Sequence, residues 1–143
     1  MTRVDFYISH STRAQNELHT ACRLADKAFR LGHSVYIHTA NAEQAERLDD
    51  LLWTFRDGSF VPHGLQQGAS GNDLPIVIGH DSEPAEIRDV LINLADTIPG
   101  FFSRFERVAE VVNGRAELRD AARERFRFYR ERGYALESHD ITD

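Results

Sequence analysis

The sequence predicts an α/β fold in which a mostly parallel sheet lies between layers of helices. Short apolar runs alternate along the chain with longer segments whose apolar residues recur every three or four positions. Residues 4–39 read as strand, helix and strand, a unit that favours parallel strands joined by a right-handed crossover. A length of 143 residues is typical of one domain. We therefore expect residues 1–143 to form a single three-layer domain with about five strands.

The N-terminal part supplies the first two strands and helices. Residues 4–8 and 34–39 are short runs rich in Val, Ile and Tyr, as buried strands are. Residues 16–31 carry an amphipathic helical pattern that we expect to end at Gly32. Three hydroxyl residues before this helix are candidate caps: Ser9, Ser11 and Thr12. Asn41 is expected to cap a second helix, which has Ala45, Leu48, Leu52 and Phe55 on one face.

The C-terminal part continues the alternation after residues 56–74, where glycine and proline predict a surface loop. Three further apolar runs predict strands: residues 75–80, 89–94 and 107–112. A short helix is expected around residues 101–105, and a last helix over 116–132 that ends at Gly133. The residues after Gly133 carry no strong signal.

Composition excludes several classes of protein. The 17 Lys and Arg against 23 Asp and Glu give a net charge of −6, which argues against binding nucleic acid over the whole surface. A single cysteine, Cys22, excludes an internal disulfide framework and a cysteine zinc site. No apolar run reaches the roughly 20 residues that span a bilayer. Since the N-terminal residues go straight into a strand pattern, we expect a cytoplasmic protein with no membrane contact.

Catalytic motifs are missing from the sequence. The glycine-rich residues 64–71 lack the Gly-Lys-Ser/Thr of a Walker loop, and the one lysine is the distant Lys27. A dinucleotide-binding fingerprint requires glycines in the turn after the first strand, and this turn contains none. The expected fold is therefore Rossmann-like without a nucleotide-binding loop. We expect no catalytic residue and no cofactor.

Seven histidines raise the question of a metal or small-molecule site. None has the His-x-x-x-His spacing of a helical metal site, so we expect no metal. His38 and His80 come at the ends of predicted strands, where α/β enzymes place their sites. A doubly wound enzyme with a small-molecule site there is the alternative interpretation.

The last helix separates its charges. Residues 115–132 hold seven arginines and four acids, which leaves a charge of −9 for the rest of the chain. On a helical wheel one side is rich in arginine: Arg115, Arg119, Arg123, Arg127 and Arg130, with Phe126 among them. The acids gather on a second side and the core residues on a third. This segregation predicts that the arginine face meets an anion. An acidic peptide with an aromatic end fits best, and a solvated face or a nucleic-acid backbone are the alternatives.

Several segments together resemble the chi subunit of bacterial DNA polymerase III holoenzyme. They cover nearly the whole chain in this order: VDFY at 4–7, RLDDLLW at 47–53, SFVPH at 59–63, RDVLINL at 88–94 and ARERFRFYR at 122–130. The resemblance implies a non-catalytic accessory subunit of the clamp-loader complex, itself part of a DNA-directed DNA polymerase active in DNA replication. It also implies a bacterial protein that acts at the replisome.

The resemblance also implies partners and site residues. Chi subunits hold the acidic C-terminal tail of single-stranded DNA-binding protein (SSB), which ends in Asp-Ile-Pro-Phe, and reach DNA indirectly through SSB. The motif match assigns this tail to Val112, Arg119, Arg123, Phe126 and Arg127. Arg119 and Arg127 stand where well-known members have lysine, and Phe126 replaces a tyrosine, so the charge is kept and one hydroxyl is lost.

A second surface is implied for the psi subunit of the clamp loader, if the source organism encodes one. It would use Trp53 and Phe60, which patterning alone would place either in the core or at an interface. We therefore expect a replication adaptor that links the SSB tail to psi. A small-molecule enzyme and a direct nucleic-acid-binding module using the same arginines are the alternatives.

Overall fold

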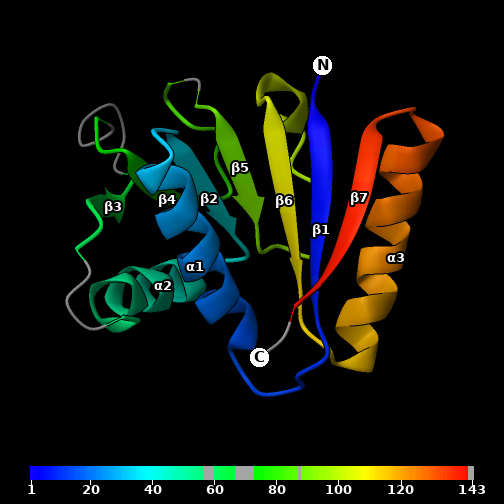
Figure 1. Cartoon of the computed structure of the whole chain (residues 1–143), viewed down its shortest axis with the longest axis horizontal. Coiled ribbons are helices and arrows are strands. Elements are labelled where there is room, and N and C mark those ends of the chain that lie inside the picture. Colours follow the sequence, from blue (N-terminus) through cyan, green and yellow to red (C-terminus); the bar gives the residue numbers. More distant parts are fainter. Residues whose placement is uncertain (57–59, 67–72, 87, 142–143) are drawn as a thin grey trace.

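In the computed structural model, residues 1–56, 60–66, 73–86 and 88–141 are described, and they form one open sheet of seven strands (Figure 1). Every neighbouring pair is parallel, and the order across the sheet is β3-β4-β2-β5-β6-β1-β7. The strands are β1 (Arg3–Ser9), β2 (Val35–Thr39), β3 (His63–Leu65), β4 (Ile76–His80), β5 (Val90–Asn93), β6 (Arg107–Val112) and β7 (Ala135–Ile141). The predicted α/β class and parallel sheet are confirmed.

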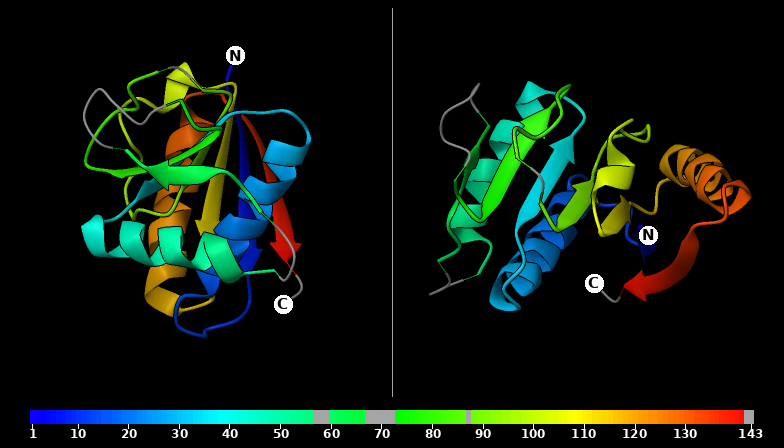
Figure 2. Two further views of the ribbon diagram at one scale, coloured as in Figure 1. Left: turned by 90° about the vertical axis from the view of Figure 1, so that its left-hand side faces the viewer. Right: turned by 90° about the horizontal axis from the view of Figure 1, so that it is seen from above.

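Helices cover both faces of this sheet (Figure 2). The helices are α1 (Asn16–Arg30), α2 (Ala42–Thr54), α3 (Ala116–Glu131) and the short 3₁₀ helix η1 (Phe102–Arg104). One apolar core packs α1 and α2 against the sheet, and a second packs α3 and η1 against the opposite face. Gly32 and Gly133 follow α1 and α3 with φ of 86° and 79°, as the predicted helix ends require. Within the described residues, no helix is long and apolar enough to cross a membrane.

The five predicted strands are all present, and two more extend the sheet at its edges. β3 lies inside the segment expected to be a loop, and β7 lies in the tail after Gly133. β1 and β2 are parallel but not adjacent, because β5 and β6 lie between them. Residues 67–72, which hold most of the glycine-rich run considered above, lie outside the described residues.

The caps differ between the two N-terminal helices. Asn41 caps α2 as predicted, and its Oδ1 accepts a hydrogen bond from the backbone N–H of Gln44 at 2.8 Å. The predicted capping of α1 by Ser9, Ser11 or Thr12 is wrong, because α1 begins after Gln15, which has a φ of 65° and no side-chain cap. The Ser9 hydroxyl accepts instead from the N–H of Ser11 and from Asn16 Nδ2, so it orders the turn between β1 and α1.

A buried polar network fixes α3 on the sheet. Glu110 of β6 has no exposed surface, and its carboxylate accepts from Arg125 Nε at 2.9 Å and from the Tyr129 hydroxyl at 2.7 Å. Asn93 Nδ2 lies 3.1 Å from each carboxylate oxygen. Arg125 also donates to the carbonyl of Asp96. Burial raises the pKa of Glu110, and the nearby guanidinium of Arg125 opposes that shift.

Candidate functional site

A small cavity opens between α3 and the carboxyl ends of β1 and β6. Arg119, Ala122, Arg123 and Phe126 follow the i, i+3, i+4, i+7 spacing, so they share one face of α3. That face lies over the sheet where β1 and β6 are neighbours. The cavity measures about 120 Å³ and is lined by Phe6, Ile8, Val112, Arg119, Ala122, Arg123 and Phe126.

The floor of this cavity is apolar. Ile8 of β1 and Val112 of β6 are register partners on adjacent strands. The Phe6 ring lies edge-on to the ring of Phe126 with a centroid separation of 5.3 Å. Phe6 and Val112 are buried, and Phe126 is half-buried. Such a floor accepts one apolar side chain and excludes water from around it.

Arginines form the rim. Arg119 is half-buried and has no ion pair with any described residue, whereas the Arg123 side chain is 70% exposed. Arg123 lies 2.9 Å from Asp120 and Arg127 lies 2.9 Å from Glu124, both as i,i+3 pairs. The acidic side of α3 is therefore less separate from the arginine side than the helical wheel indicated. Exposed pairs of this kind contribute little stability, so a ligand carboxylate can replace the internal one.

The structure brings four of the five residues assigned to the SSB tail around one cavity. Val112, Arg119, Arg123 and Phe126 line it, whereas Arg127 lies outside the lining residues. Sequence reasoning missed Phe6, Ile8 and Ala122. The alternation of Phe6 and Ile8 along β1 could have found two of them, because both point to the α3 face of the sheet.

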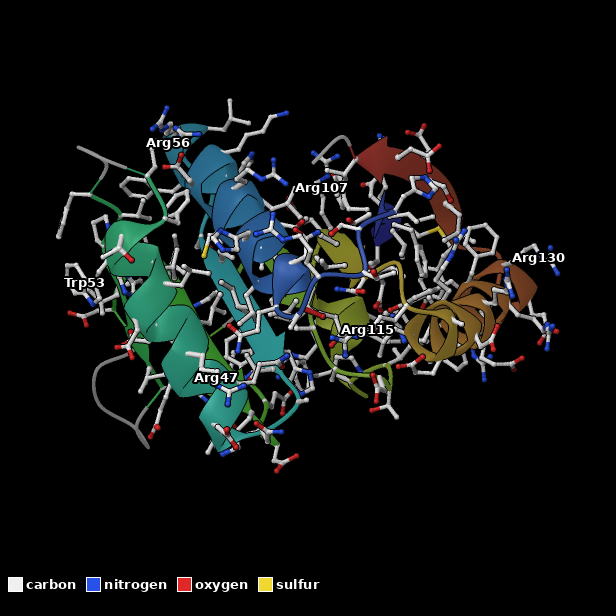
Figure 3. All side chains as sticks on the ribbon, turned by 90° about the horizontal axis from the view of Figure 1, so that it is seen from below. Arg47, Trp53, Arg56, Arg107, Arg115 and Arg130 are labelled. Carbon is white, nitrogen blue, oxygen red and sulfur yellow. The ribbon has the colours of Figure 1, made fainter. Side chains whose placement is uncertain are left out.

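The two aromatic residues assigned to psi lie together on the surface. Trp53 in α2 is 53% exposed and Phe60 is 66% exposed, and their ring centroids are 5.7 Å apart. Trp53 also packs on the ring of the buried His63 of β3 at 4.6 Å. Figure 3 shows Trp53 and Arg130 at opposite ends of the molecule. The aromatic pair is thus a second surface, remote from the cavity on α3.

The two histidines of the alternative enzyme interpretation lie on neighbouring strands, since β2 pairs with β4. His38 is buried, its Nδ1 is 3.1 Å from Asn93 Oδ1, and its ring packs edge-on to Phe101. His80 is half-buried. The side chain of His38 is therefore occupied by structural contacts rather than presented to a ligand.

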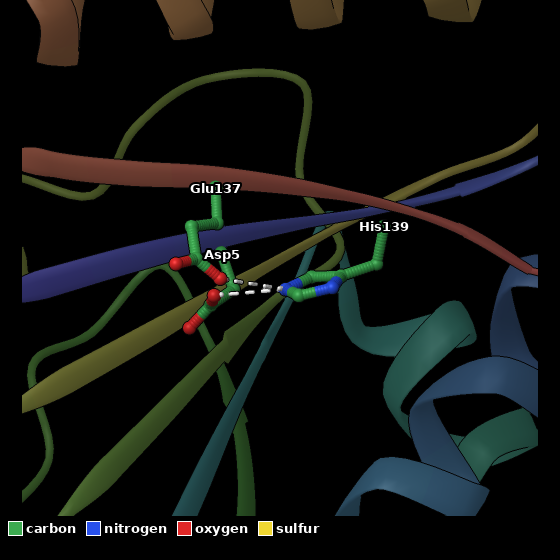
Figure 4. A group of neighbouring side chains, drawn as sticks. All are labelled: Asp5, Glu137 and His139. Carbon is green, nitrogen blue, oxygen red and sulfur yellow. Dashed lines mark hydrogen bonds and ion pairs between the residues drawn. The ribbon is translucent and has the colours of Figure 1, made fainter.

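A third cluster joins β7 to β1 (Figure 4). Asp5, Glu137 and His139 each offer a ligand atom, and these atoms lie within 4.8 Å of one another. His139 Nε2 is 3.0 Å from Asp5 Oδ1, and its ring stacks on Tyr7. Arg3 lies 3.5 Å from the Asp5 carboxylate and 3.0 Å from the Glu137 carboxylate. The guanidinium of Arg3 therefore already supplies the positive charge that a metal ion would bring to these two acids. The cluster is explained as an ion-pair network that holds the edge strand.

Comparison with known proteins gives the family. Residues 1–137 match the family described as "DNA polymerase III chi subunit, HolC". The DNA polymerase III subunit chi of Pseudomonas aeruginosa is 47% identical over 141 residues, which cover 99% of this chain and 98% of that protein. The chain belongs to the DNA polymerase III chi subunit family. Chi subunits of Haemophilus influenzae and Escherichia coli K12 are 32% and 34% identical over 137 and 116 residues. These matches cover 95% and 80% of this chain, and 95% and 79% of those proteins.

Membership of the chi family decides against the enzyme alternative. The chain is an accessory, non-catalytic subunit of a bacterial DNA polymerase, so the enzyme alternative is wrong.

The fold itself is more widespread than the family. The crystal structure of T4 UvsW matches with a TM-score of 0.67 at 9% identity, over 99% of this chain and 42% of that chain. That likeness concerns the fold alone.

Proposed function

We propose that this chi-family protein is a replication adaptor that binds the acidic C-terminal tail of SSB in the cavity on α3 and joins it to the psi subunit. It would act in the cytoplasm at the replisome and reach DNA indirectly through SSB. The observation that supports tail binding is the combination of an apolar floor with an arginine rim in one small cavity.

The chemistry of the tail matches the two halves of the cavity. A C-terminal phenylalanine presents a ring and a free carboxylate on the same residue. The ring packs against Phe126 and Val112, and the carboxylate is bound by Arg119 and Arg123 at the rim. The acidic residues that precede the C-terminal phenylalanine of the tail extend toward Arg127, which lies one turn beyond Arg123 on α3. Guanidinium–carboxylate contacts are strong and directional, so the rim selects an anionic terminus.

The test is calorimetry of the full-length protein with a peptide that ends in Asp-Ile-Pro-Phe. Arg119→Ala and Arg123→Ala should each weaken binding by about 1.5–3 kcal/mol, roughly tenfold to a hundredfold. Arg130→Ala is the matched control on the same helix, and a peptide with an amidated C-terminus tests the carboxylate directly. Unchanged affinity in both rim variants would refute the site.

Psi binding rests on a separate observation, the exposed pair of Trp53 and Phe60. Large exposed aromatic side chains in contact with one another are typical anchors of protein interfaces. We assign this pair to psi because the chi family belongs to an assembly with further subunits. Co-purification with psi should be lost in Trp53→Ala and Phe60→Ala. Leu31→Ala, which removes an equally exposed apolar side chain elsewhere, should leave it intact.

A further inference from the structure

The outward face of α1 carries positive charge that neither proposed binding surface uses. Arg23 and Lys27 are exposed and one helical turn apart, and Arg13 is exposed just before the helix. None of the three forms an ion pair with another described residue. We call Arg13, Arg23 and Lys27 the α1 ridge. Figure 3 shows Arg56 and Arg107 on either side of the far part of α1, and Arg115 near its beginning.

The acids of α1 itself form no ion pair with the α1 ridge. α1 contains two acids, Glu17 in its first turn and Asp26. The Asp26 side chain is only 5% exposed and is already bonded by Arg30 and Arg56 at 3.2 and 3.1 Å. In a protein with a net charge of −6, three exposed cations that form no ion pair with a described residue are available to attract an anionic ligand.

The surface beside the ridge indicates which anion it binds. An open cavity of about 350 Å³ lies beside two residues of the ridge, Arg13 and Arg23, and is also lined by Ala14, Asn16, His19 and Phe55. Lys27, one turn further along α1, lies outside this lining. No carboxylate lines the cavity, and Phe55 supplies an aromatic ring that is half-buried. Its apolar lining residues are Ala14 and Phe55, whereas five apolar side chains line the cavity on α3. Arg23 and Lys27 are about 6 Å apart along the helix axis, a separation suited to successive phosphates of an extended strand.

We propose that, in addition to the indirect route through SSB, the α1 ridge itself binds the phosphate backbone of single-stranded nucleic acid, with a base stacked on Phe55 in the cavity. Cations that follow a backbone beside an aromatic ring are the usual elements of sequence-independent single-strand binding. α1 and α3 lie on opposite faces of the sheet. A strand on the ridge and a peptide on α3 can therefore be bound at the same time.

The test measures binding of a fluorescent oligothymidylate to the full-length protein at low salt. Arg23→Glu/Lys27→Glu should lose about tenfold or more in affinity and keep its unfolding midpoint. Because each phosphate contact contributes about −0.7 to the slope of log K against log salt, the wild-type slope should be about −2 and that of the double variant should approach −0.7. Arg119→Glu/Arg123→Glu changes the charge equally on the other face and should retain the oligonucleotide.

A second readout uses the one lysine of the chain. Bound oligonucleotide should protect Lys27 from acetylation, as measured by mass spectrometry. The proposal is overturned if the wild-type protein does not bind the oligonucleotide, or if the α1 and α3 variants lose it equally. It is also overturned if poly-glutamate displaces the oligonucleotide as effectively as unlabelled strand, since the ridge would then bind acidic protein.

Discussion

Replacing Arg125 by Ala tests whether the buried network holds α3 in place. The change removes the cation beside Glu110, whose carboxylate has no exposed surface, and leaves it with the Tyr129 hydroxyl and the Asn93 amide. Removing one partner of a buried ion pair leaves a charge that water cannot reach, which costs about 3–5 kcal/mol. Tyr129→Phe removes one hydrogen bond to the same carboxylate and should cost about 1.5–3 kcal/mol.

Urea denaturation followed by circular dichroism measures these losses. Arg130→Ala, an exposed change on the same helix, should stay within about 0.5 kcal/mol of the wild type. Arg125→Met combined with Glu110→Leu should be more stable than Arg125→Met alone, because no buried charge is then left without a partner. If Arg125→Ala costs less than about 1 kcal/mol, the buried network around Glu110 does not hold α3 on the sheet.

The same variant should depend on pH in a defined direction. Burial raises the pKa of Glu110 above its ordinary value of 4.5, and without Arg125 this rise is larger. The folded Arg125→Ala protein then binds a proton at pH values where the unfolded chain has released it. Its stability relative to the wild type should therefore fall as pH rises above about 4.5. A difference between the two proteins that does not change with pH would contradict the raised pKa.

Three further predictions concern single side chains. Burial raises the pKa of Cys22 to about 12, so the thiol should not react with a disulfide reagent at pH 8 until urea unfolds the protein. Trp53 is the one tryptophan and more than half exposed, so its emission should change little on unfolding and shift to the blue when psi binds. His139→Ala removes the contacts to Asp5 and Tyr7 and should cost about 1 kcal/mol in urea denaturation, since arginines still pair with Asp5.

Much of the fold could be predicted because its central strands and long helices have strong periodic patterns. The two edge strands could not. β3 has three residues, His63–Leu65, too few for a pattern. β7 reads ALESHDI, with polar residues on both faces: His139 and Glu137 pair with Asp5 and Arg3, and Leu136 packs against the apolar core under α3. Pairing with a strand more than 100 residues away in the sequence leaves no local signal.

The residues that α3 contributes to the candidate site could be predicted from the sequence, whereas those that β1 contributes to its floor could not. Helical spacing brings Arg119, Arg123 and Phe126 together, so a single segment carries the information. Phe6 and Ile8 come from the other end of the chain and enter only through the pairing of β1 with β6. Arg125 shows the opposite case. It interrupts the apolar side of α3, and only the position of Glu110 on β6 explains its burial.

The sheet order also determines when the cavity can exist during synthesis. β1 is the first strand made, yet its neighbours are β6 and β7, which are separated from it by about a hundred residues or more. Both edges of β1 therefore lack their strand partners while β2 to β5 are being translated. Since the cavity needs β1, β6 and α3 together, a nascent or truncated chain lacks it, and the cavity forms only once nearly the whole subunit has been made.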